Sequence, residues 1–159
     1  MRTAYKLLAY LVAVEVVIQA MAMVWAIAGL GKWVTEGGVL DKATIESGGK
    51  PFPEITGLIV HGINGSFVVP GIALILVIVS FFSRLRGAIK WAAIVFVLAV
   101  VQGQLGFLGH EIPAVGALHG LNALALFLGA IYAGRRIRTA SRSGAAPAEE
   151  QHVAAAPVG

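Results

Sequence analysis

The stretch Val60-His61-Gly62-Ile63-Asn64 is repeated later in the chain, with similar residues, as Leu118-His119-Gly120-Leu121-Asn122. Each copy places a histidine, a glycine and an asparagine inside a long apolar run. A histidine within a membrane-spanning segment is energetically expensive, and such a residue usually has a functional role. Two histidines in matched surroundings therefore suggest one site that is built from two similar halves.

The composition around these stretches is that of an integral membrane protein. Of 159 residues, 58% are hydrophobic and 13% are charged, whereas soluble domains average about 45–50% apolar and about 25% charged residues. The net charge of +4 does not indicate a nucleic-acid partner, because the basic residues flank apolar runs. The chain has no cysteine, which excludes disulfides, c-type haem attachment and thiolate metal sites.

Four apolar stretches reach the roughly 20 residues that a bilayer-spanning helix needs. They cover residues 7–30, 56–82, 91–109 and 114–134. The predicted fold is all-α: a transmembrane four-helix bundle over residues 1–138, followed by a disordered tail over 139–159. Pro70-Gly71 predicts a bend within the second span. Residues 31–55 are expected to form an outer loop with a short helix at 40–46.

Two further features concern the ends of these spans. The first span could instead be a signal peptide cleaved near Gln19-Ala20-Met21-Ala22, but its length and Glu15 favour a membrane helix. His110-Glu111-Ile112-Pro113 is predicted to form a tight turn, with the proline in the first turn of the next helix.

The basic residues are distributed unequally between the two ends of such a bundle. Nine lie on the side of the chain termini: Arg2, Lys6, Arg84, Arg86, Lys90, Arg135, Arg136, Arg138 and Arg142. Only Lys32, Lys42 and Lys50 lie on the other side. Because cytoplasmic loops carry an excess of lysine and arginine, both termini are predicted to be cytoplasmic.

A second resemblance supports an internal repeat. Val17-Ile18-Gln19 in the first span corresponds to Val100-Val101-Gln102 in the third. Each half then has a glutamine-bearing helix followed by a helix that opens with His-Gly-aliphatic-Asn. This order predicts two pseudo-symmetric helical hairpins related by an axis along the membrane normal.

The repeat places the two histidines at one level of the bundle. Each lies about five residues into its helix, roughly 7–8 Å below the outer end, and the two helices are expected to be parallel. Two level imidazoles that face each other across a bundle core fit the axial positions of a haem iron. The sequence therefore predicts one haem between His61 and His119, in an electron-transfer or redox-accessory protein.

Small and polar neighbours complete the predicted haem site. Gly62, Gly65 and Gly120 are expected to let a flat macrocycle approach the helices. Asn64 and Asn122 would hydrogen-bond a propionate, the other hairpin or a water, and Gln19, Gln102 and Gln104 would add polar contacts. A ligating imidazole also needs an acceptor for its second ring nitrogen, and the carbonyls of Gly57 and Val115, one turn earlier, are candidates.

On these residues the chain resembles one four-helix half of the haem A synthase family, and also small four-span membrane proteins of actinobacteria. In that family each half carries one histidine near the outer end of its second helix and one in its fourth, which His61 and His119 match. The resemblance implies a b-type haem on the outer side of a bacterial plasma (inner) membrane. Leu58 stands where the family's catalytic half has a glutamate, and Gly62 stands where a basic residue is common. The resemblance therefore implies haem binding rather than haem A synthesis.

Other interpretations of the same residues stay open. The histidines could serve as polar contacts between helices in a cofactor-free subunit of a larger complex or in an oligomer. They could also join His110 and Glu111 in a zinc or copper site. Glu15 is expected to pair with a polar group of a neighbouring helix, with proton transfer or quinone contact as the functional alternative. The expected partners are the lipid bilayer and a membrane oxidoreductase or quinone, and no enzymatic activity of the chain alone is predicted.

Overall fold

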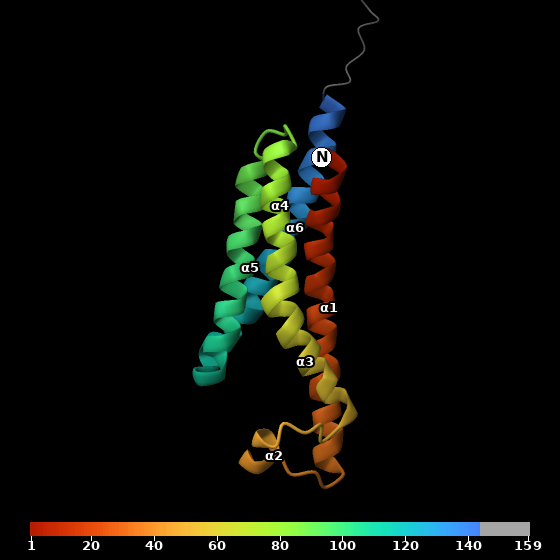
Figure 1. The fold of residues 1–159 in the computed structure, drawn as a ribbon, viewed down its shortest axis with the longest axis vertical. Coiled ribbons are helices and arrows are strands. Elements are labelled where there is room, and N and C mark those ends of the chain that lie inside the picture. Colours follow the sequence, from red (N-terminus) through yellow and green to blue (C-terminus); the bar gives the residue numbers. More distant parts are fainter. Residues whose placement is uncertain (144–159) are drawn as a thin grey trace, which may run out of the picture.

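The computed structural model describes residues 1–143, which form helices joined by turns and loops and contain no strand (Figure 1). Four helical segments in this part of the chain are long and apolar enough to cross a membrane. They are α1 (Arg2–Thr35), the composite segment Pro53–Phe82, α5 (Ala88–Glu111) and α6 (Pro113–Ser143). The predicted all-α, multi-pass membrane class is thus confirmed, and each helix extends beyond the predicted span.

The helix boundaries refine the sequence-based limits. The turn between α5 and α6 consists of Ile112 alone, and α6 begins at Pro113. Proline favours the first position of a helix because its φ angle is fixed near the helical value and its missing N–H is not needed there. At its other end α6 continues to Ser143, so the first five residues of the predicted tail, 139–143, are helical. The rest of that tail lies outside the described residues.

The second membrane segment is not one regular helix. It consists of a 3-10 turn η1 (Pro53–Ile55), α3 (Thr56–Ile63), a π-helical turn η2 (Asn64–Val68) and α4 (Val69–Phe82). Pro70 has no N–H to donate to the turn before it, and the wider π-turn, closed by Val69 N–H to the Asn64 carbonyl, accommodates this loss. The irregularity predicted at Pro70-Gly71 therefore lies just before the proline, and α3 leans away from α4 towards α1 (Figure 1).

The buried core occupies the half of the bundle that contains the N-terminus. Small side chains line it, which lets membrane helices approach closely. The buried core residues of the spans are Tyr5, Ala9, Val12, Ala13, Val69, Ala73, Leu76, Ala88, Ala92, Val95, Ala99, Leu126, Ala130 and Ala133. The Tyr5 hydroxyl donates a hydrogen bond of 3.1 Å to the Ala88 carbonyl and so ties the start of α1 to the start of α5.

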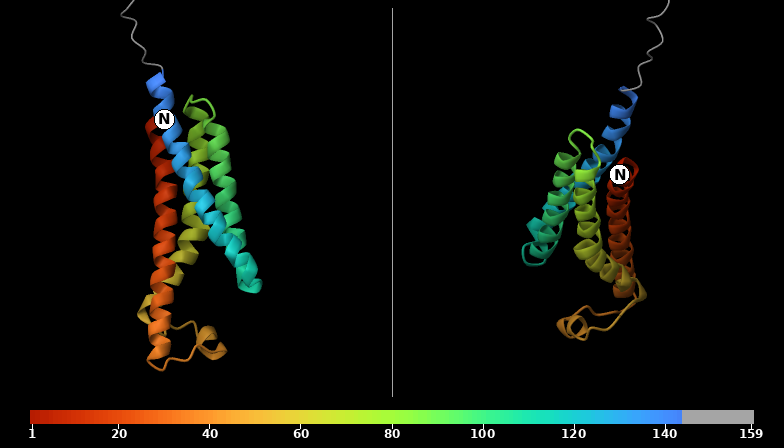
Figure 2. Two further views of the ribbon diagram at one scale, coloured as in Figure 1. Left: turned by 180° about the vertical axis from the view of Figure 1, so that it is seen from behind. Right: turned by 45° about the horizontal axis from the view of Figure 1, so that its top comes forward.

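At the opposite end the helices separate into two pairs. There α3 packs along α1, and α5 packs along α6, with few contacts between α3 and the second pair. The two pairs diverge in Figure 1, and Figure 2 shows α6 crossing from the side of α1 to the end of α5 that lies away from the N-terminus. Glycines permit both close pairings, since Gly57 lies against the Ala22 carbonyl and Gly109 against Gly116.

The segment between α1 and η1 lies at the end of the first pair that is remote from the N-terminus. It contains the short helix α2 (Lys42–Glu46), which confirms the helix predicted at 40–46. The Thr44 amide donates to the Asp41 side chain at 2.8 Å, which caps α2 and holds the pKa of that carboxyl below its usual value. Phe52 is buried, and its ring lies 5.5 Å from that of Trp33.

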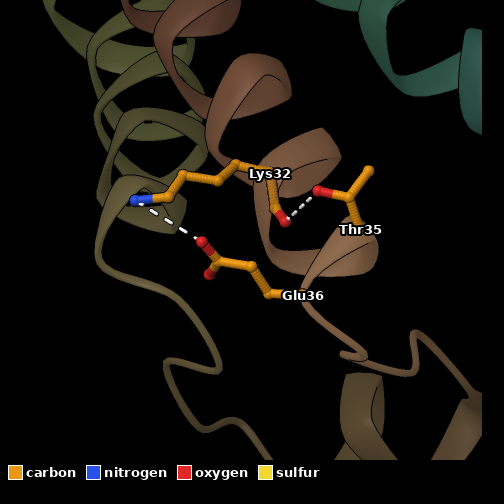
Figure 3. A network of polar contacts seen from close by, with 3 residues as sticks. All are labelled: Lys32, Thr35 and Glu36. Carbon is orange, nitrogen blue, oxygen red and sulfur yellow. Dashed lines mark hydrogen bonds and ion pairs between the residues drawn. The ribbon is translucent and has the colours of Figure 1, made fainter.

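The last turn of α1 is closed by local polar contacts (Figure 3). The Thr35 hydroxyl donates to the Lys32 carbonyl at 2.7 Å, and the Lys32 ammonium lies 3.8 Å from the Glu36 carboxylate. Both members of this ion pair are largely exposed, so it contributes little to stability. These contacts end the helix where the chain leaves the apolar region.

The surface of the spans is apolar over most of its length. Large side chains such as Val24, Phe67 and Leu121 are 69%, 74% and 65% exposed. Contiguous exposed apolar surface of this kind is stable only when it is covered, and four apolar helices indicate that a lipid bilayer covers it.

Candidate functional site

The two repeated histidines meet between the diverging helix pairs. His61 comes from α3 and His119 from α6, and both side chains are half-buried. Their ring centroids are 6.0 Å apart, with the ring planes inclined by 58°. Metal–imidazole bonds of about 2.0 Å on opposite sides of one ion put two ring centres roughly 6 to 6.5 Å apart. The observed separation is thus close to that of two axial ligands of a single ion.

Each histidine ring is oriented by a backbone carbonyl of the preceding membrane helix. His119 Nδ1 lies 3.0 Å from the Gln102 carbonyl oxygen, and His61 Nδ1 lies 3.2 Å from the Gln19 carbonyl oxygen. A carbonyl oxygen can only accept, so His119 Nδ1 carries the proton and its Nε2 keeps a free lone pair; His61 has the same tautomer when its Nδ1 donates to the Gln19 carbonyl. This is the arrangement that fixes a histidine as a metal ligand.

The acceptors differ from those predicted. The carbonyls of Gly57 and Val115 belong to the same helices as the histidines and lie one turn earlier. The rings instead bond across to α1 and α5. Carbonyls inside a helix remain bonded along their own helix, but their second lone pair is available to a neighbouring side chain.

The two asparagines form a second pair of contacts, one helical turn deeper in the bundle. Asn64 Nδ2 donates to Glu15 Oε2 at 2.7 Å. Asn122 Nδ2 donates to the Leu98 carbonyl at 2.9 Å and to Gln102 Oε1 at 2.7 Å. One predicted option was a hydrogen bond from each asparagine to the other hairpin. Instead, each asparagine bonds to the preceding helix of its own hairpin.

The Gln19 side chain takes part in the first of these contacts. Its amide fits the surroundings with the oxygen accepting from Asn64 Nδ2 at 2.8 Å and the nitrogen donating to the His61 carbonyl at 3.0 Å. In this orientation the amide nitrogen also lies 2.8 Å from His61 Nδ1, a bond that competes with the one to the Gln19 carbonyl. Asn64 then contacts Gln19 as Asn122 contacts Gln102.

The predicted glycines have different surroundings. A Cβ at Gly62 or Gly120, the residues that follow the histidines, would meet open space, as expected for positions that leave room for a flat ligand. A Cβ at Gly65 would instead lie 3.3 Å from Gln19 Oε1. Gly65 therefore makes room for the Gln19 side chain, and its contact with a macrocycle stays a prediction.

Gly106 of α5 was not singled out from the sequence. A Cβ there would lie 3.3 Å from both Cε1 and Nδ1 of His119, so the ring rests directly on this glycine. The recurrence of glycine in Gln102-Gly103-Gln104-Leu105-Gly106 was the available signal, but only the helix packing identifies which glycine touches the ligand.

A shallow, open apolar groove of about 440 Å³ lies on the surface of the second membrane segment. Its lining comes from α3 and η2, including Leu58, Gly62 and Phe67, and from Phe107 of α5, whereas neither His61 nor His119 lines it. The volume lies in the range of about 300–1,000 Å³ that is usual for small-molecule sites.

The remaining predicted residues do not join the site. Gln104 is exposed, since two residues beyond Gln102 a helix has turned by about 200°. His110 and Glu111 are exposed at the end of α5. Among residues 1–143, no three or more histidine, aspartate or glutamate side chains are grouped as a metal site requires, so the four-residue zinc or copper site is not assembled.

The donor set and the space around it fit a haem better than a small metal ion. Two imidazoles with free Nε2 atoms supply two ligands, as haem iron needs, whereas a structural zinc ion needs four. Gly62 and Gly120, which follow the two histidines in the sequence, have open space where a Cβ would lie. Comparisons of the chain with protein-family models, with curated proteins and with solved structures found no match, so the site is interpreted from its own geometry.

Proposed function

We propose that this membrane protein binds one b-type haem between His61 and His119 and serves in electron transfer. The observation that carries the proposal is the pair of rings with centroids 6.0 Å apart, each with Nδ1 directed at a carbonyl of the neighbouring helix. Interhelical polar contacts alone would not require two histidines on different helices to face each other. Their unprotonated Nε2 atoms would then lack a partner inside the bundle.

Both histidines have a defined task in this function. His61 and His119 would hold the iron together, and with both bound no coordination position would be left open for oxygen. Gln19 and Gln102 orient the rings through their backbone carbonyls, and Gly62, Gly106 and Gly120 keep the space between the helices free of side chains. When bound, the haem supplies a one-electron redox centre.

The arrangement of the chain in the membrane belongs to the same proposal. The corresponding contacts of His61 and His119 and of Asn64 and Asn122 support two pseudo-symmetric hairpins. The excess of basic residues at the end of the termini supports an N-in/C-in orientation in a bacterial plasma membrane. The site then faces the outer leaflet, where a membrane oxidoreductase or a quinone would exchange electrons with it.

The spectrum of the purified protein tests the proposal. The chain is produced with haem precursor, purified in detergent and loaded with additional haemin. A reduced-minus-oxidised difference spectrum is expected to show the Soret and α bands of a six-coordinate b-type haem, at one haem per chain by pyridine haemochrome assay. A protein that stays colourless after loading would overturn the proposal and support a cofactor-free subunit.

The orientation is tested by labelling single cysteines, for which the cysteine-free chain is suited. Ser47 and Thr3 are both exposed, at opposite ends of the bundle. In intact cells a membrane-impermeant maleimide is expected to label Ser47→Cys, and to label Thr3→Cys only after the membrane is permeabilised. The reverse pattern would contradict the N-in orientation.

A further inference from the structure

Glu15 is a partly buried carboxyl group within a membrane-spanning helix, and no basic side chain of residues 1–143 forms an ion pair with it. Within residues 7–30, 56–82, 91–109 and 114–134 it is the only aspartate or glutamate, and these stretches contain no lysine or arginine. The other ionisable side chains in them are Tyr10, His61, His119 and Tyr132. Ionisable residues in such positions are rare and commonly mark pathways for ions or protons.

The second half of the internal repeat has no carboxyl group at the position that corresponds to Glu15. Glu15 lies four residues before Gln19, and its counterpart four residues before Gln102 is Leu98. In that second half, Asn122 is anchored by the Leu98 carbonyl and by Gln102. Asn122 is therefore anchored to its neighbouring helix although the residue that corresponds to Glu15 is a leucine.

The carboxyl group lies close to the histidine pair. Glu15 Oε2 accepts from Asn64 Nδ2 at 2.7 Å, and Asn64 is one helical turn from His61 on α3. Gln19, which contacts both Asn64 and His61 in its fitted orientation, lies one turn from Glu15 on α1. Only the side chains of Asn64 and Gln19 thus separate Glu15 from His61. Apolar surroundings of this kind screen the interaction between a charge on Glu15 and a charge at the site only weakly.

The other ionisable groups of the spans do not occupy this place. Tyr10 of α1 lies against Gly134 of α6 and near Lys6, towards the inner end of the bundle. Tyr132 of α6 stacks on Trp91 of α5, with ring centroids 4.3 Å apart. From α3 and α6, His61 and His119 are the ionisable groups on the side of the site, and they are the proposed ligands. No lysine or arginine of these spans is available to balance a charge on the Glu15 carboxylate.

We propose that Glu15 takes up a proton when the site between His61 and His119 is reduced, so that electron transfer is coupled to proton uptake. This inference rests on the proposed haem function. The ferric iron–porphyrin core that His61 and His119 would hold has one positive charge apart from the propionates, and the Glu15 carboxylate would stabilise that charge. One electron from a one-electron donor cancels that charge, and one proton from water then neutralises the carboxylate as Glu15 becomes a carboxylic acid. Asn64 holds the carboxyl group in place.

A spectroelectrochemical titration at several pH values tests this coupling, with an electrode and soluble mediators as the electron donor. In the wild-type protein the midpoint potential is expected to fall as the pH rises, by up to about 59 mV for each tenfold decrease in proton concentration. Glu15→Gln keeps the side-chain shape and an oxygen for Asn64 but carries no charge. Its midpoint potential is expected to be independent of pH, equal to the wild-type value at low pH and higher at high pH.

Two more variants make the result specific. Glu15→Leu, which copies the residue of the second half, is expected to lose the pH dependence as Glu15→Gln does. Glu111→Gln removes an exposed carboxylate at the end of α5 and is expected to keep the wild-type dependence. A protein that binds haem but has a pH-independent potential, or a Glu15→Gln variant with the wild-type slope, would overturn the inference. A protein that binds no haem would instead overturn the proposed function.

Discussion

Alanine at either His61 or His119 is expected to abolish six-coordinate haem binding. Removing a residue that merely orients a metal ligand commonly lowers affinity by about 10–100-fold, and loss of the ligand itself costs at least as much. The rings face each other at a centroid separation of 6.0 Å, and no other histidine of residues 1–143 is grouped with them. Each variant is therefore expected to lose the Soret and α bands or to show a five-coordinate spectrum.

Two controls separate loss of a ligand from loss of the fold. His110→Ala removes an exposed histidine at the end of α5 and is expected to leave the spectrum unchanged. His119→Gly leaves a cavity the size of the ring, and added imidazole is expected to restore the six-coordinate spectrum. If His61→Ala and His119→Ala both retain the wild-type bands, the assignment of the ligands is wrong.

Leucine at Gly106 is expected to reduce haem binding at least tenfold although residue 106 is not a ligand. A Cβ alone at this position would lie 3.3 Å from two atoms of the His119 ring, and the rest of a leucine side chain needs more space. The ring must move, which breaks the bond between Nδ1 and the Gln102 carbonyl. Haemin titration monitored at the Soret band measures the change in affinity.

Matched glycine variants show whether this effect is local. Gly106→Ala is expected to weaken binding less than Gly106→Leu, because only the Cβ meets the ring. Gly71 of α4 faces open space, so Gly71→Leu is expected to bind haem as the wild-type protein does. Equal affinities of the Gly106→Leu, Gly71→Leu and wild-type proteins would contradict the contact between Gly106 and His119.

Much of the site was predictable because the two copies of the repeat can be compared with each other within one sequence. The match of His61 with His119 and of Gln19 with Gln102 identified residues that the structure brings together. Hydropathy and length identified the four spans, since a bilayer imposes both. These signals are local in sequence, so they need no knowledge of how the helices pack.

The parts that escaped prediction depend on packing or on an irregular backbone. The carbonyls that orient the histidines could not be chosen without the rotation of α1 and α5 about their axes. The π-turn η2 adds to this difficulty, because each extra residue in a helical turn rotates the preceding side chains by about 100° relative to a regular helix. Pro70 indicated an irregularity, but not its type, and the type determines where His61 and Asn64 point.

The uneven burial along the bundle has a consequence for the order of assembly. The buried core joins all four spans at the end of the termini, whereas the other end consists of two helix pairs with few contacts between them. Segments with few buried contacts open more readily than the rest of a protein. A ligand held by His61 on one pair and His119 on the other would act as a cross-link between them. Separation of the two pairs and ligand release would then be one event, with a rate set by the weaker of the two attachments.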